Sequence, residues 1–182
     1  GQLKYRKGWD LLLRAAPAVL QHHPTATFVF NTHSPVAQSE FTRLVEELGI
    51  GRHVHLLHRI DEEEKARLFH AADVLCLPTR YEGFGLPIAE AMAAGLPVVA
   101  TRLPVIDEMV TDGYDGVLVP YDDPAALAGA LSDLLADAPR RARLAANARA
   151  SVRRFDIDRV VADLLAAYRA LAEERGERGG RR

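Results

Sequence analysis

Apolar residues in this chain form short, nearly continuous runs separated by longer amphipathic segments. Five runs have the composition of strands buried on both faces of a parallel sheet, at 26–31, 54–57, 73–77, 97–100 and 116–119. Between them apolar positions recur at helical spacing, as at Phe41, Leu44, Val45 and Leu48. Strand and helix alternate in strict order, which predicts an α/β fold with a doubly wound, mostly parallel sheet.

Capping residues indicate where several helices begin and end. Ser34 before Pro35 is a typical N-cap with proline at the first helical position, and Gly49 is a natural stop for that helix. Asp61 and Glu64 form a capping-box pattern, and the helix that follows is expected to direct Leu68, Phe69 and Ala72 inward. Further helices are predicted at 87–94, from Asp123-Pro124 onward, at 139–154 and at 158–173. The first helix, from about Trp9, contains Pro17, which predicts a kink or an early end.

Composition narrows the classes of protein. The 182 residues are 48% hydrophobic, enough for one domain with a full core, and the net charge of −2 gives no electrostatic case for nucleic-acid binding. No apolar run is long enough to cross a bilayer, and residues 1–4 do not begin a signal peptide. The single cysteine, Cys76, lies in an apolar run and is read as a buried thiol. These features favour a cytoplasmic protein.

The loop after the third apolar run combines several features that favour an anionic ligand. Gly83 and Gly85 allow a ligand to approach the main chain, and Pro87 opens a helix whose free N–H groups and dipole favour a diphosphate. Glu82 and Glu90 are both expected to point into one cleft, where a carboxylate suits the vicinal hydroxyls of a ribose or hexose. By itself, the G-x-G pattern would indicate only a turn.

The longer pattern from Glu82 to Val99, with two glutamates separated by seven residues, resembles the signature of retaining glycosyltransferase family 4. Further stretches are similar to elements of that family along nearly the whole chain: Lys7-Gly8 with Leu11, Leu12 and Ala15; 54–58; 73–78; and 107–116. The resemblance implies the C-terminal, Rossmann-like donor domain of a two-domain (GT-B) enzyme. It implies retaining, metal-independent transfer of a hexosyl group from a nucleotide-diphosphate sugar, without a cofactor, to an acceptor that is a glycan, a lipid or a small molecule.

The same resemblance implies roles for individual residues. Glu90 would bind the ribose hydroxyls, Glu82 would hold hydroxyls of the transferred sugar, and Lys7 would neutralise the diphosphate leaving group. Backbone amides of the loop would meet the sugar and the diphosphate, at Gly83, Phe84, Gly85 and Leu86. The nucleotide base would lie against His58, Arg59 and Ile60, largely through main-chain contacts.

The resemblance also predicts how the domain is organised. Residues 1–157 would form the donor-binding domain, and 158–174 a helix that packs toward an N-terminal acceptor domain outside this sequence. Residues 175–182 are rich in glycine and arginine and are expected to be frayed; peripheral contact with acidic lipid is a second interpretation of their charge. The family's motif normally follows the domain's first strand, so this strand is expected to be missing, and the chain alone is expected to be inactive.

Several positions depart from the family pattern and leave alternatives open. Gln2 stands where the family usually has a phosphate-binding arginine, residues 31–33 replace a glycine-rich turn, His58 replaces a glycine, and Thr79 replaces a serine. One alternative is a degenerate nucleotide-sugar-binding module without turnover, and another is a different GT-B enzyme such as an epimerase or phosphorylase. His53, His55 and His58 lack the companion ligands of a zinc site.

Overall fold

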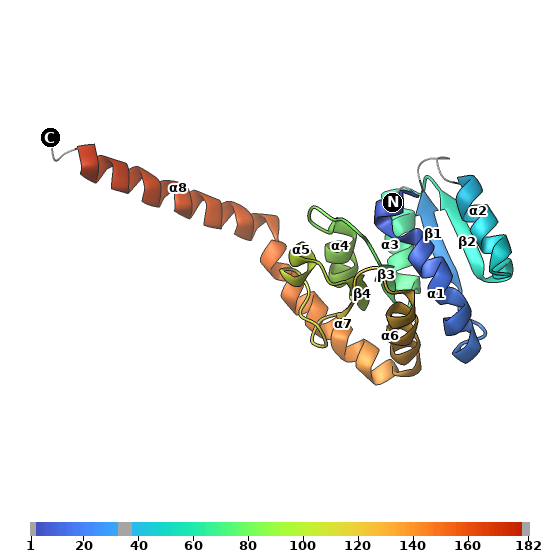
Figure 1. Ribbon diagram of the computed structural model, residues 1–182. Helices are drawn as coiled ribbons and strands as arrows, with labels where there is room; N and C mark the ends of the chain where they lie inside the picture. Colours follow the sequence, from blue (N-terminus) through green and yellow to red (C-terminus); the bar gives the residue numbers. More distant parts are fainter. Residues whose placement is uncertain (1–2, 33–37, 180–182) are drawn as a thin grey trace.

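The computed structural model describes residues 3–32 and 38–179, and within them helices and strands alternate along the chain (Figure 1). The helices are α1 (Trp9–His22), α2 (Gln38–Glu47), α3 (Glu62–Ala71), α4 (Leu86–Ala94), α5 (Pro104–Asp107), α6 (Pro124–Ala136), α7 (Ala138–Val152) and α8 (Ile157–Gly179). The strands are β1 (Phe28–Thr32), β2 (Val54–His58), β3 (Leu75–Leu77), β4 (Val98–Thr101) and β5 (Val117–Val119). Short 3₁₀ turns are η1 (Tyr5–Lys7), η2 (Gly51–His53) and η3 (Arg153–Phe155).

All paired strands are parallel, as predicted, but they form two small sheets. One has the order β1-β2 and the other the order β3-β4-β5. A cavity of about 730 Å³ separates the sheets and is lined by residues 28–31 of β1 and 75–77 of β3.

Helices cover both faces of the three-stranded sheet, so this part of the fold is doubly wound. In β4, Val99 packs in one core cluster with Leu13 of α1 and Leu131 of α6. Its neighbours Val98 and Ala100 pack in a second cluster with Met92 of α4 and residues of α5 and α7. Alternate residues of one buried strand thus face two helical layers, which is why the strand is apolar at every position.

Most of the predicted elements are confirmed. Asp61 accepts the Glu64 N–H at 2.7 Å and Glu64 accepts the Asp61 N–H at 3.0 Å, completing the capping box. Gly49 and Gly95 adopt left-handed backbone angles where their helices stop. Phe41 and Leu44 are buried on α2, whereas the predicted start of this helix at Ser34-Pro35 lies outside the described residues.

Two expectations about helices are wrong or only partly right. The α1 helix does not end early at Pro17 but continues to His22, because Leu13, Ala16 and Val19 on either side are fully buried. Ala72 is exposed, and Leu68 and Phe69 are only half-buried. The apolar side of α3 lines the cavity between the sheets instead of a closed core, which explains that exposure.

The last helix, α8, projects away from the body of the domain (Figure 1). It runs to Gly179 and so includes 175–179 of the tail that was expected to be frayed, while 180–182 lie outside the described residues. Its apolar residues are exposed, as expected for a helix that would pack on another domain: Val161 45%, Leu164 51%, Leu165 48% and Tyr168 61%.

Candidate functional site

The candidate site lies at the carboxyl ends of the parallel strands, where open α/β sheets bind ligands. The loop after β3 leads through Gly85, whose φ of 93° requires the left-handed region, into α4 with Pro87 in its first turn. The α4 helix begins at Leu86, one residue before the predicted start. Gly85 has no side chain with which to cap the helix, so the first turn presents main-chain donors and the positive end of the helix dipole.

Lys7 and Glu82 are 75 positions apart in the sequence and form a close ion pair. The Lys7 ammonium donates to Glu82 Oε2 at 2.6 Å, and the two side chains are only 21% and 10% exposed. The turn that carries Lys7 can approach this loop because Gly8 has a φ of 66°; a Cβ there would lie 1.8 Å from the Pro78 carbonyl oxygen. The structure therefore brings together the two residues to which the family resemblance gives roles at the leaving group and at the transferred sugar.

Glu90 occupies the second turn of α4 and pairs with Lys65 of α3. The Lys65 ammonium donates to Glu90 Oε1 at 2.9 Å, and it also contacts Glu62 at 2.6 Å. Hydrogen bonds to Glu62 and Glu90 raise the pKa of Lys65, so it remains protonated at neutral pH. Sequence analysis did not select Lys65. The Asp61 N-cap, four residues earlier, was the only sequence signal that could have placed Lys65 near the start of α3.

The large cavity between the sheets extends to this edge of the fold. Its lining includes Lys7, Ile60, Lys65, Pro87 and Glu90. Glu82 is not among the lining residues and reaches the cavity through Lys7, so the expectation that both glutamates point into one cleft holds directly only for Glu90.

The loop residues predicted to contact the donor, Gly83 to Leu86, differ in their contacts and in their exposure. The Gly83 N–H donates to Glu82 Oε1 at 3.2 Å, and Phe84 packs edge-on against Phe155 with ring centroids 5.5 Å apart. Gly85 is buried, whereas Phe84 and Leu86 are 47% and 58% exposed. The loop is thus held by the Gly83–Glu82 hydrogen bond and by one aromatic contact.

Arg59 and Ile60, the predicted base-binding residues, follow β2. Arg59 is an exposed non-glycine residue with a φ of 52°, and its N–H donates to the Thr32 carbonyl at 3.0 Å. This bond fixes the turn to the end of β1. Ile60 is half-buried and lines both the large cavity and a smaller one of about 440 Å³ beside α3.

The part of the chain that the structure describes contains no group of three residues suited to hold a metal ion. His53, one of the histidines considered for zinc, has a structural contact: its Nδ1 lies 3.0 Å from the Ala26 carbonyl and its Nε2 accepts from Arg52. Gln2, at the departure from the phosphate-binding arginine, lies outside the described residues. No helix within the described ranges is long and apolar enough to cross a membrane.

Parallel strands with helices packed on both faces place this domain in the Rossmann-like class of α/β folds. The model of the family described as glycosyl transferases group 1 matches residues 1–151. The chain belongs to that family.

Comparisons with individual proteins agree with this membership. A D-inositol 3-phosphate glycosyltransferase of Xylanimonas cellulosilytica is 36% identical over 178 residues, which is 98% of this chain and 43% of that protein. The structure of the Anabaena HepE protein in complex with UDP-glucose superposes with a TM-score of 0.80 at 25% identity, covering 92% of this chain and 47% of that one. The C-terminal domain of a glycosyl transferase group 1 protein, LpcC from Francisella tularensis, gives 0.76 at 27% identity, covering 86% of this chain and 82% of that one.

These comparisons confirm the resemblance to the glycosyltransferases and the fold of the GT-B donor domain. The alternative of an epimerase or phosphorylase is not favoured, because the matching relatives are named as glycosyltransferases. The chain spans less than half the length of the curated relative that it matches.

Proposed function

We propose that this chain binds a nucleotide-diphosphate sugar and that the protein to which it belongs transfers the sugar to an acceptor with retention of configuration, without a metal ion. The observation that supports this most directly is the approach of the Lys7 ammonium to Glu82 at 2.6 Å beside the first turn of α4. A cation, a carboxylate and a helix N-terminus at one strand edge suit an anionic diphosphate linked to a polyhydroxylated sugar.

In this proposal Lys7 acts on the leaving group. Negative charge accumulates on the diphosphate as the bond to the sugar breaks, and a fixed ammonium stabilises that charge more in the transition state than in the ground state. Lys7 carries three N–H donors, one of which is directed to Glu82, so the remaining donors can meet phosphate oxygens. The amides of Gly85 and Leu86 would share the phosphate charge.

The two carboxylates would orient the donor. Glu90 would accept hydrogen bonds from the two ribose hydroxyls. The bond from Lys65 would keep the Glu90 side chain extended from α4 toward the cavity. Glu82 would hold sugar hydroxyls, with its own orientation fixed by Lys7 and the Gly83 N–H. Such fixed geometry lowers the entropic cost of reaching the reactive arrangement.

The relatives suggest classes of donor and acceptor for the tests. The HepE structure contains UDP-glucose, and the Xylanimonas relative is named for an inositol phosphate acceptor. We propose a hexosyl donor and a cytoplasmic site of action, with the base, the sugar and the acceptor to be found by screening.

The test has two parts. Calorimetric titration of the chain with UDP, GDP and ADP should show binding of at least one. A transfer assay with radiolabelled UDP-, GDP- and ADP-sugars should then show activity for the full-length protein and none for the chain alone, because the acceptor side of the cleft comes from another domain. Absence of nucleotide binding in both the chain alone and the full-length protein would overturn the proposal. Robust transfer by the chain alone would overturn the assignment of the site to two domains.

A further inference from the structure

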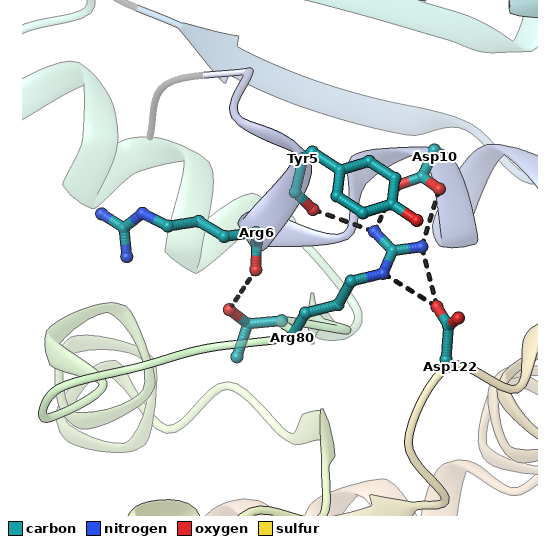
Figure 2. A network of polar contacts seen from close by, with 6 residues as sticks. Tyr5, Arg6, Asp10, Arg80 and Asp122 are labelled. Carbon is teal, nitrogen blue, oxygen red and sulfur yellow. Dashed lines mark hydrogen bonds and ion pairs between the residues drawn. The ribbon is translucent and has the colours of Figure 1, made fainter.

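Arg80 lies in the loop after β3, two residues before Glu82, and its guanidinium connects three separate segments (Figure 2). Its two terminal nitrogens donate to the two carboxylate oxygens of Asp10 at 2.7 and 2.8 Å, which joins the loop to α1. It also donates to the Tyr5 carbonyl at 2.9 Å, and its Nε donates to Asp122, between β5 and α6, at 2.8 Å.

All five N–H donors of Arg80 are directed to protein acceptors. The fifth, on Nη2, faces Asp122 Oδ1 at 2.7 Å. The side chain is 8% exposed, and its outer face is covered by the Tyr5 ring, whose centroid lies 3.8 Å from the guanidinium carbon. A guanidinium that is saturated and covered in this way is not placed to bind a phosphate directly.

The segment that Arg80 holds is the turn that carries Lys7. Besides the side-chain bond to Tyr5, the Arg80 N–H and the Thr79 hydroxyl both donate to the Arg6 carbonyl, at 2.7 and 2.8 Å. The Arg6 side chain points away from this network (Figure 2). The Tyr5–Lys7 turn is therefore attached to the same loop that supplies Glu82, through main-chain contacts and through one arginine.

The third segment of the network is also held in an uncommon conformation. Asp122 has a φ of 56°, in the left-handed region that non-glycine residues seldom adopt. Such angles persist where the surrounding contacts fix them. Arg80 thus ties the beginning of α1, the loop after β3 and the loop after β5 together at one edge of the sheet.

We propose that Arg80 is a positioning residue, which fixes the Tyr5–Lys7 turn on the loop after β3 so that the Lys7 ammonium meets the diphosphate of the donor. This inference rests on the proposed function. Arg80 acts through Lys7 and Asp10 and does not itself touch the ligand. Lysine cannot replace it, since an ammonium lacks the planar fork that engages both oxygens of Asp10 and the Tyr5 carbonyl together.

The test compares ligands with and without the diphosphate in the full-length protein. UDP, GDP and ADP and their nucleosides are titrated against the wild type, Arg80→Ala, Arg80→Lys, Lys7→Ala and the double variant. Arg80→Ala and Arg80→Lys should weaken the best-bound diphosphate by about tenfold, the scale of one hydrogen bond to a charged group, and leave nucleoside affinity unchanged. In the Lys7→Ala background, the Arg80 substitution should cause no further loss. Equal weakening of nucleoside and diphosphate, or additive losses, would overturn the inference.

Arg102→Ala is the control, because Arg102 also bridges two carboxylates, Asp107 and Asp112, but its hydrogen bonds do not involve the Tyr5–Lys7 turn. Hydrogen exchange separates this inference from the proposed function. The Lys7 and Gly8 amides, bonded to the Lys4 and Tyr5 carbonyls, should exchange faster in Arg80→Ala and not in Arg102→Ala.

If the wild type binds no diphosphate, the proposed function fails. Unchanged exchange at these two amides would overturn the positioning role. If Arg80→Ala does not fold, Asp10→Asn, which keeps the side-chain shape, replaces it in the titrations and in the hydrogen-exchange measurement.

Discussion

Replacing Glu90 with alanine isolates the carboxylate assigned to the ribose. Glu90 extends from the second turn of α4 into the cavity lining, and its side chain is 29% exposed. The substitution removes both carboxylate oxygens and leaves Lys65 with Glu62 as a partner. Alanine favours the helix, so the backbone of α4 is not disturbed.

Two magnitudes separate a binding role from a structural one. A carboxylate that accepts two ribose hydroxyls contributes about 1–3 kcal/mol, which corresponds to a loss of roughly 5- to 150-fold in nucleotide affinity. The Glu90–Lys65 pair lies at a partly exposed surface, where an ion pair contributes about 0–1 kcal/mol to the free energy of unfolding. The change in binding should therefore exceed the change in stability.

The assay is calorimetric titration with the nucleotide that the wild type binds best, beside urea unfolding of the same samples. Glu62→Ala is the matched control. It removes the other carboxylate partner of Lys65, but its side chain is 89% exposed and does not line the cavity. The control should bind the nucleotide like the wild type.

Unchanged affinity in a folded Glu90→Ala protein would refute the ribose assignment. Equal weakening by Glu62→Ala and Glu90→Ala would show that the Lys65 ammonium, and not the carboxylate, carries the effect.

Three further predictions follow from the contacts. Lys7→Ala in the full-length enzyme should lower turnover more than nucleoside affinity, because the diphosphate charge grows in the transition state; turnover near the wild-type value would make Lys7 a solvated charge. Gly8→Ala should lower the free energy of unfolding by more than about 2 kcal/mol, because a Cβ at this left-handed position meets the Pro78 carbonyl. Gly49→Ala should lower it by about 1 kcal/mol, because Gly49 is equally left-handed but has open space around it. Equal losses in urea unfolding would contradict this prediction. Burial raises the pKa of Cys76 from 9.0 to about 12, so the native thiol should stay protonated and react slowly with a thiol reagent at pH 8 and faster as the pH rises. Because the unfolded thiol ionises near pH 9, its contribution to stability is present below that pH and lost as the pH rises toward 12; Cys76→Ala should flatten this part of the stability curve.

The sequence was most informative where one local cause decides the structure. The Asp61 capping box, the glycine stops and the apolar strands depend on neighbours within a few residues, and the structure has them in the expected places. The course of α1 through Pro17 was not predictable in this way. The lost main-chain hydrogen bond is offset by burial against α6, which is distant in sequence.

The candidate site likewise contains residues that sequence motifs indicated and residues that only tertiary contacts revealed. The pattern from Glu82 to Val99 was sufficient to select Glu82 and Glu90 and to indicate the family, and the Lys7-Gly8 stretch selected Lys7. It did not reveal Lys65, because the approach of α3 to α4 depends on how the helices pack around the cavity. It also did not single out Arg80, whose bonds connect segments 42 to 75 positions away.

The sequence alone determined the order of the elements and their parallel arrangement, and it indicated the candidate site residues, because periodicity, capping and motif spacing are local properties of the chain. Only the tertiary structure decided which charges meet, how the turn before α1 is attached to the loop after β3, and that the strands form two sheets with a cavity between them. These features depend on contacts between distant segments, and such contacts are fixed by packing and by the hydrogen bonds that buried polar groups must find.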